Sequence, residues 1–173
     1  MHNAHLAMAR AALEKLKLDR VLWMPTGNPG YRKPPVASGA ERVAMLKLAL
    51  ADEARYRIDE RELAPGASGY TIDTLKALRQ EQAGDKLYLL IGADQFAKFD
   101  SWREPEEIKR LAELAIFLRP QIAIQPRDAQ VIAMEPLDIS ASDIRARAAR
   151  GEDLSGLVPA AVANYIQRRR LYS

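Results

Sequence analysis

The sequence contains no cysteine and only two histidines among its 173 residues. The lack of cysteine excludes a disulfide framework, a thiolate zinc site and a cysteine nucleophile, and two histidines alone make a poor zinc site. Long hydrophobic runs are also missing, because the longest, residues 87–93, is far shorter than the ~20 residues that a membrane-spanning helix needs. The N-terminus has neither the basic nor the apolar region of a signal peptide. We therefore expect a cytoplasmic protein with no membrane partner.

Several motifs of nucleotide-binding and hydrolytic enzymes are absent as well. There is no G-x-G-x-x-G fingerprint and no G-x-x-x-x-G-K-[ST] loop, which disfavours an NAD-dependent dehydrogenase and a P-loop NTPase. A G-x-S-x-G elbow and the aromatic signatures of RNA-binding domains are missing too. The 26 basic and 23 acidic residues are dispersed and give a net charge of +3. We expect no nucleic acid partner, since a nucleic-acid-binding module is supported only by this small excess and by Arg168–Arg170.

The residues that are present predict one α/β domain spanning residues 1–173, a length that fits a single domain. The composition, 48% hydrophobic and 28% charged, is typical of a globular protein. Hydrophobic periodicity predicts helices over residues 4–16, 38–50, 71–82, 105–113, 141–150 and 159–169, and strands over 20–24, 55–59, 86–91, 114–118 and 131–134. This alternation predicts a doubly wound parallel sheet with flanking helices, and we expect the helices after residue 141 to pack on it.

Local patterns sharpen this prediction at three places. Ser38 and Glu41 form an S-x-x-E capping box at the start of a helix, and Thr71 is expected to cap the helix that follows it. The continuous apolar run over residues 86–91 predicts a strand that is buried on both faces. Ligands of such sheets bind outside the carboxyl ends of the strands, so the segments that follow strands are the candidate site.

The first candidate is the pair His2 and His5 at the start of a helix. Free backbone N–H groups and the positive end of the helix dipole attract phosphate there, and imidazoles can donate to a triphosphate as charge develops. The alternative is an unordered terminal pair. The second candidate is Ser140, Ser142 and Arg145, which would surround a phosphate at another helix start. The alternative there is a simple capping box formed by Ser140 and Asp143.

Two further candidates follow strands. Gly92 ends the strongest strand and lets a ligand approach the backbone, Asp94 can accept ribose hydroxyls, and Trp102 offers a stacking surface. The alternative is a turn glycine, a capping aspartate and a core tryptophan. The basic loop over residues 25–33, which includes Lys33, is either a phosphate clamp or a solvated turn.

The order of these motifs along the chain resembles the HxGH nucleotidyltransferase superfamily. The sequence looks most like the bacterial nicotinate-nucleotide adenylyltransferases of NAD biosynthesis, which residues 59–63, 68–75 and 117–120 also resemble. The resemblance implies a Rossmann-like fold and a reaction in which ATP and nicotinate mononucleotide give the dinucleotide and pyrophosphate, with Mg²⁺. It also implies that the partners are small nucleotides, and it leaves a homo-oligomer open.

The resemblance assigns roles to the candidate residues. It places the ATP phosphates against His2 and His5, with His5 stabilising the transition state, and against Ser140, Ser142, Arg145 and Arg119. It places Gly92 and Asp94 beside the ribose and adenine. For the acceptor nucleotide it implies Trp102 stacked on the pyridine ring, with Tyr70, Thr71 and Lys33 as further contacts. No residue is assigned to bind a metal.

The sequence also departs from the family pattern. Ala4 replaces the family's glycine, Ser142 replaces a threonine, and the loop around Lys33 differs from the usual Pro-Pro-His-Lys. The family's first apolar strand and its Gly-Gly-x-Phe-Asp-Pro loop are not found in this sequence. We therefore expect the sheet to lack its first, central strand, leaving unpaired backbone groups, unless something else fills that position.

Two alternatives to the nicotinate enzyme stay open. One is an adenylyltransferase for another phosphorylated acceptor, such as phosphopantetheine. The other is a catalytically impaired nucleotide-binding fold, because the missing Gly-Gly-x-Phe-Asp-Pro loop contacts the ATP phosphates in the family.

Overall fold

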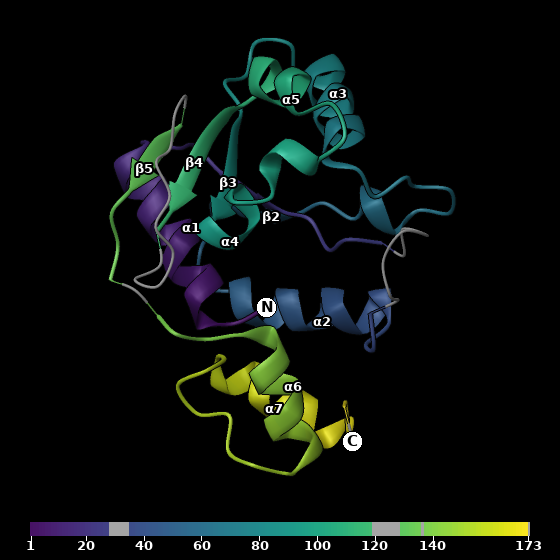
Figure 1. Ribbon diagram of the computed structural model, residues 1–173. Helices are drawn as coiled ribbons and strands as arrows, with labels where there is room; N and C mark the ends of the chain where they lie inside the picture. Colours follow the sequence, from purple (N-terminus) through teal and green to yellow (C-terminus); the bar gives the residue numbers. More distant parts are fainter. Residues whose placement is uncertain (28–34, 119–128, 136, 173) are drawn as a thin grey trace.

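The computed structural model describes residues 1–27, 35–118, 129–135 and 137–172, and the chain alternates between helices and strands (Figure 1). The helices are α1 (Asn3–Lys15), α2 (Gly39–Leu50), α3 (Thr71–Glu81), α4 (Ala93–Phe96), α5 (Pro105–Leu111), α6 (Ala141–Ala149) and α7 (Ala160–Arg168). The strands are β1 (Val21–Trp23), β2 (Tyr56–Ile58), β3 (Tyr88–Gly92), β4 (Glu113–Phe117) and β5 (Gln130–Ile132). Short 3₁₀ helices cover Arg61–Leu63 and Phe99–Ser101. None of the described helices is long and apolar enough to cross a membrane.

The strands form two parallel sheets instead of one. Strands β1 and β2 pair with each other, with Val21 opposite Tyr56. Strands β3, β4 and β5 form the second sheet in that order. Among the described residues no strand joins β1 to β3. For the part of the chain that the structure describes, the expectation that the sheet lacks a central strand is confirmed.

A cavity of about 1640 Å³ lies where that strand would pair, and both sheet edges contribute to its wall. Val21 and Leu22 line it from β1, and residues 87–91 line it from β3. The predicted burial of β3 on both faces is wrong, because Ile91 is its only buried residue. The apolar run in the sequence does form a strand, but the neighbour that would cover one edge is missing. Strand β4, which has a neighbour on each side, is buried from Leu114 to Phe117.

Helices cover both faces of the three-stranded sheet, as the doubly wound prediction requires. Ala12 of α1 packs against Ala115 and Phe117 on one face. Ile72 of α3 and Ile108 of α5 share a cluster with Ile91, Leu114 and Ile116 on the other face. Because the side chains of a strand alternate between its faces, β4 contributes to both clusters.

Helix α1 also holds the two sheets together. Its Ala9 and Leu13 form a buried cluster with Val21 of β1, and Leu90 of β3 packs against the same cluster. Polar contacts add to this link. The Arg20 guanidinium lies 2.6 Å from the Asp85 carboxylate, which joins the residues that precede β1 and β3.

The predicted helix start at Ser38 is confirmed, and the one at Thr71 needs a correction. Ser38 and Glu41 make both hydrogen bonds of the capping box. Thr71, however, is the first helical residue of α3, and Tyr70 precedes it in an extended conformation without a side-chain cap. A capping residue must itself be non-helical, so Thr71 cannot fill that role.

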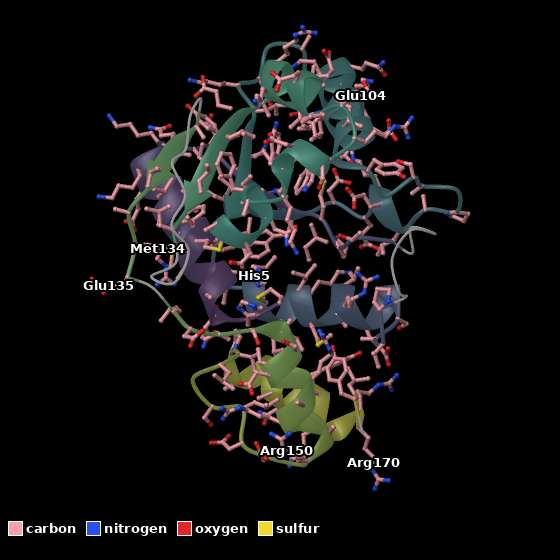
Figure 2. The ribbon with its side chains drawn as sticks, viewed as in Figure 1. His5, Glu104, Met134, Glu135, Arg150 and Arg170 are labelled. Atoms are coloured by element: carbon pink, nitrogen blue, oxygen red, sulfur yellow. The ribbon has the colours of Figure 1, made fainter. Side chains whose placement is uncertain are left out.

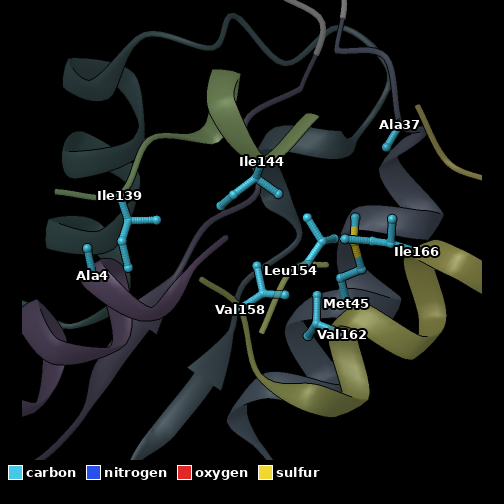
Figure 3. Close-up of a cluster of buried hydrophobic side chains, with 9 residues drawn as sticks. All are labelled: Ala4, Ala37, Met45, Ile139, Ile144, Leu154, Val158, Val162 and Ile166. Carbon is cyan, nitrogen blue, oxygen red and sulfur yellow. The ribbon is translucent and has the colours of Figure 1, made fainter. Parts of the chain in front are cut away.

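Helices α6 and α7 form a separate layer beside α2 (Figure 1). Met45 of α2 packs there with Val162 and Ile166 of α7, and the same cluster reaches Ala4 at the start of α1 (Figure 3). The C-terminal helices therefore bring the end of the chain against its beginning.

Candidate active site

The first turn of α1 holds its two histidines in a defined arrangement. His2 is the N-cap residue in an extended conformation, and its side chain is only 4% exposed. The His2 and His5 rings stack with their centroids 3.9 Å apart, while His5 itself is exposed. Asn3 fixes this turn to the C-terminal region, because its backbone N–H and its Nδ2 donate to the carbonyl oxygens of Leu157 and Gly156.

The start of α6 presents two hydroxyl groups close to each other. Ser140 is the N-cap residue, and its Oγ accepts a hydrogen bond from the Asp143 backbone N–H. The Oγ atoms of Ser140 and Ser142 lie 3.0 Å apart. Asp143 is the predicted second member of a capping box, and its carboxylate accepts a hydrogen bond from Nε of Arg147 at 2.8 Å.

These two helix starts contribute to one buried apolar cluster. Ala4 belongs to the same buried cluster as Ile139 and Ile144, which flank the two serines in sequence (Figure 3). The residue that replaces the family's glycine is thus part of the packing between the two motifs. The shared cluster therefore brings the histidine and serine pairs, far apart in sequence, to the same part of the fold. Figure 2 shows His5 at the junction between the sheets and the α6–α7 layer.

Positive charge accumulates around this place. Burial lowers the pKa of the Met1 amino group, and the charges of Arg145 and Arg42 lower that pKa further. Arg42 of α2 donates to the carbonyl oxygens of Thr26 and Ala37, and burial lowers its pKa as well. Several nearby cations attract an anion such as phosphate. The sequence prediction had found Arg145 but not Arg42, because the capping box next to Arg42 indicates only the start of a helix.

The end of β3 gives a ligand room to approach. Gly92 is the last residue of β3, and a Cβ atom placed there would meet no other atom within 4 Å. Ala93, which begins α4, is fully buried. Asp94 follows in the first turn of α4 with its Oδ1 atom buried.

The aromatic candidates lie in the wall of the cavity between the two sheets. Tyr70, Thr71 and Trp102 all line it. Trp102 also packs against Phe99, with ring centroids 5.4 Å apart, so it is partly a core residue, as the alternative interpretation held. Trp102 therefore contacts the core and also borders the cavity.

Sequence reasoning missed three polar residues in the same part of the wall, namely Gln95, Lys98 and Arg103. The Arg103 guanidinium lies over the Tyr70 ring, 4.9 Å from its centroid. The available signal was the presence of two cations within four residues of Trp102. It was overlooked because an exposed Lys or Arg is ordinary in any sequence.

Two predicted site residues, Lys33 and Arg119, lie outside the described residues. The described part of the basic loop ends at Gly27, where a Cβ atom would collide with the Glu62 carbonyl oxygen. Only glycine allows this close approach of the two backbones. Among the residues that the structure describes, no group of three or more His, Cys, Asp or Glu side chains could hold a metal ion.

The chain is similar to known proteins along nearly its whole length. The Cytidylyltransferase-like family matches residues 1–147. A probable nicotinate-nucleotide adenylyltransferase of Chromobacterium violaceum is 41% identical, and the match covers 99% of this chain and 93% of that protein. One of Laribacter hongkongensis is 39% identical, with 99% and 89% covered. The chain belongs to the nicotinate-nucleotide adenylyltransferase family.

Solved structures of this family confirm the fold. The Plasmodium falciparum nicotinic acid mononucleotide adenylyltransferase complexed with NaAD superposes with a TM-score of 0.83 at 16% identity, covering 99% of this chain and 91% of that one. A putative nicotinate-nucleotide adenylyltransferase from Vibrio parahaemolyticus gives a TM-score of 0.71 at 18% identity, covering 99% and 87%. The two separate sheets are thus parts of the Rossmann-like nucleotidyltransferase fold of this family.

Proposed function

We propose that this protein transfers the adenylyl group of ATP to nicotinate mononucleotide and so serves NAD biosynthesis. The observation that carries the proposal is the buried cluster that Ala4 shares with Ile139 and Ile144, which brings the histidine and serine motifs to the same part of the fold. The family membership of the chain and the names of its relatives support the choice of substrate.

In the proposed reaction a phosphate oxygen of the mononucleotide attacks the α-phosphorus of ATP. The new P–O bond forms while the bond from the α-phosphorus to the oxygen that bridges to the β-phosphorus breaks, and pyrophosphate leaves. No covalent enzyme intermediate is required, so the protein acts by positioning the reactants and stabilising charge.

The phosphate end of the site supplies that stabilisation. The exposed imidazole of His5 would donate to the ATP phosphates, and the buried His2 ring, stacked at 3.9 Å, would keep His5 in place. The hydroxyls of Ser140 and Ser142 and the charge of Arg145 would hold the departing pyrophosphate. We propose Arg119 and Lys33 as further phosphate contacts on the basis of the resemblance alone.

Magnesium would enter together with ATP. Mg²⁺ is commonly held by substrate phosphates and only one or two carboxylates, and the described residues offer no larger acidic cluster. Asp94, at the start of α4, is the carboxylate that lies beside the strand end where ATP would bind. When bound, the ion would neutralise part of the triphosphate charge.

The test is turnover with ATP and each candidate acceptor, following the adenylylated product and pyrophosphate together. We expect equal amounts of nicotinate adenine dinucleotide and pyrophosphate. Product from phosphopantetheine and none from nicotinate mononucleotide would refute the proposed acceptor. Binding of the mononucleotide without any turnover would instead establish the impaired fold.

A matched pair of variants tests the phosphate end. His5→Ala should lower kcat by roughly 10²-fold, the usual cost of removing one donor that stabilises transition-state charge. Lys15→Gln, an exposed change at the other end of the same helix, should leave kcat unchanged. Equal kcat values for the two variants would show that His5 does not contribute to catalysis.

A further inference from the structure

The last described residues of the chain turn back onto the cluster that joins the starts of α1 and α6. After α7 the Arg170 N–H donates to the Gln167 carbonyl oxygen at 3.1 Å, and the Leu171 N–H donates to the Ile166 carbonyl oxygen at 3.0 Å. These two bonds form a Schellman motif, which reverses the chain at the end of a helix. Leu171 and Tyr172 then pack against the buried cluster that contains Ile166.

This reversal places two residues with side chains in the left-handed region. The φ angles of Arg170 and Tyr172 are +49° and +73°. A Cβ atom makes this conformation unfavourable, and glycine usually takes the position that Arg170 holds in a Schellman motif. Such strain persists only where surrounding contacts fix the backbone. The packing of Leu171 and Tyr172 on the cluster supplies those contacts, so the place of the Tyr172 ring is defined.

The half-buried Tyr172 hydroxyl lies among charged groups of the phosphate end. Burial raises its pKa, the charges of Arg145 and Arg42 oppose that rise, and the charge of Glu41 adds to it. The hydroxyl is therefore protonated at neutral pH and can donate a hydrogen bond. Arg145 and Arg42 are also the two cations that lower the pKa of the Met1 amino group.

The groups around this hydroxyl offer it no open acceptor. A guanidinium only donates, so neither Arg42 nor Arg145 can accept its proton. The Glu41 carboxylate is engaged, because its Oε2 accepts hydrogen bonds from the backbone N–H and the hydroxyl of Ser38, both at 2.8 Å. Within the described part of the chain, neither the Tyr172 hydroxyl nor the Arg145 guanidinium has a hydrogen-bond partner.

Arg42 is held beside this hydroxyl by backbone groups. Its Nη1 donates to the Thr26 carbonyl oxygen at 2.6 Å, and its Nε donates to the Ala37 carbonyl oxygen at 3.3 Å. Ala37 belongs to the cluster against which Tyr172 packs. Carbonyl oxygens fix the guanidinium but do not neutralise it, and they leave most of its five N–H donors available. A fixed cation and an unused hydroxyl therefore lie together near Arg145.

From this arrangement we propose that Tyr172 and Arg42 bind the pyrophosphate part of ATP together with Arg145, the hydroxyl of Tyr172 donating to a phosphate oxygen. This inference rests on the proposed function, since it takes Arg145 as a contact of the ATP phosphates. A phosphate oxygen supplies the acceptor that the hydroxyl lacks and the negative charge that the two guanidiniums lack. The end of the chain would thus complete a site that the first turns of α1 and α6 begin.

The experiment measures equilibrium binding of ATP and of AMP by calorimetry. AMP keeps the base, the ribose and one phosphate but has no pyrophosphate part. The proteins are the wild type, Tyr172→Phe, Arg42→Lys and the control Tyr165→Phe. Tyr165 of α7 packs against the same cluster, so the control removes the same hydroxyl group from a neighbouring ring. Thermal melts of all four proteins check that each is folded.

We expect Tyr172→Phe to bind ATP roughly three- to tenfold more weakly than the wild type, the usual range for one hydrogen bond. Arg42→Lys should also weaken ATP binding, because lysine lacks the planar set of donors. Affinity for AMP should stay unchanged in both variants, and Tyr165→Phe should match the wild type for both ligands. Equal losses for ATP and AMP, unchanged ATP binding, or the same loss in Tyr165→Phe would overturn the inference.

Turnover with nicotinate mononucleotide separates this inference from the proposed function. A wild type that binds ATP with the expected dependence on Tyr172 but forms no dinucleotide would refute the function and leave the role of Tyr172 standing. Normal turnover with the same ATP affinity in all four proteins would refute the roles of Tyr172 and Arg42 alone. A wild type that does not bind ATP would overturn both.

Discussion

Strands β4 and β1 of the same fold differ in the number of strands that pair beside them. Strand β4 pairs with β3 on one side and with β5 on the other, and four of its five residues are buried. Among the described strands β1 pairs only with β2, and its other edge faces the cavity. Apart from Glu113 the residues of both strands are apolar, so the difference lies in their neighbours. Burial of a strand depends on which segments pair beside it, and the strand's own composition does not determine it.

The described residues of the candidate site come from α1, α6 and the three-stranded half of this divided sheet. Its histidines and serines belong to α1 and α6, which pack on each other independently of the cavity. Its aromatic residues belong to the three-stranded half, where Tyr70 and Trp102 pack against the cluster around Phe99. The side chains that would bind nucleotides are therefore held by complete clusters, although the sheet between them is open.

The largest expected effect is on the free energy of unfolding, when the same substitution is made in each of the two halves. Ile116→Ala in β4 removes a fully buried side chain and should cost about 3–4 kcal/mol, the usual range for such a cavity. Ile58→Ala in β2 removes a half-buried one and should cost about 1 kcal/mol. Urea unfolding of both variants measures the two values. Equal costs would show that the two halves are equally well packed.

The next prediction fills the open position. An N-terminal extension that carries an apolar strand and a Gly-Gly-x-Phe-Asp-Pro loop should pair between β1 and β3. We expect a gain of about 2 kcal/mol after the entropy of ordering the strand, which corresponds to a rise in Tm of about 4–8 °C for a protein of this size. A control extension with two prolines in the strand cannot complete the ladder. A control that stabilises equally would show that the cavity does not accept a strand.

A smaller effect concerns the polar link between the halves. Arg61 follows β2 and lies 2.8 Å from Glu81 at the end of α3, which packs on the three-stranded half. A double-mutant cycle with Arg61→Gln and Glu81→Gln should give a coupling of about 0.5–1 kcal/mol. The exposed Lys86–Glu113 pair joins β3 to β4 within one half, and its cycle should give less. A larger coupling for that pair would contradict the bridging role of Arg61.

The smallest effect is a pH dependence confined to the two-stranded half. Hydrogen bonds from Arg55, next to β2, lower the pKa of Glu53 from 4.5 to about 2. A carboxyl group with a depressed pKa in the folded state contributes stability above its unfolded pKa, and that contribution disappears as pH falls towards 2. The Tm of the wild type should therefore fall slightly more than that of Glu53→Gln between about pH 5 and pH 2. Equal falls in Tm for the two proteins would show that the Glu53–Arg55 pair does not contribute to stability.

Prediction from the sequence succeeded where a local pattern determines the structure. It failed where contacts with distant segments determine it. The capping box of Ser38 and Glu41 spans four residues, so its sequence is sufficient evidence. Thr71 was misplaced by one position because the extended conformation of Tyr70 depends on its packing against the core. The apolar run of β3 could not reveal its missing neighbour.

The candidate site shows the same limit. The motif residues His2, Ser140 and Trp102 were identified because the order of motifs along the chain resembles a family. Arg103 was missed because its importance arises only when Tyr70, thirty-three residues earlier in the chain, lies beneath it. A cavity wall assembled from separate segments cannot be predicted from any one of them.

The measurement that tests this account most directly is hydrogen exchange at the backbone amides of β1, β3 and β4. In a parallel sheet the N–H groups of a strand point alternately to its two neighbours, and unpaired amides exchange fast. If β1 and β3 are open edges of one divided sheet, all β4 amides should exchange slowly and alternate amides of β1 and β3 should exchange fast. Uniformly slow exchange along β1 and β3, equal to that of β4, would contradict the divided sheet.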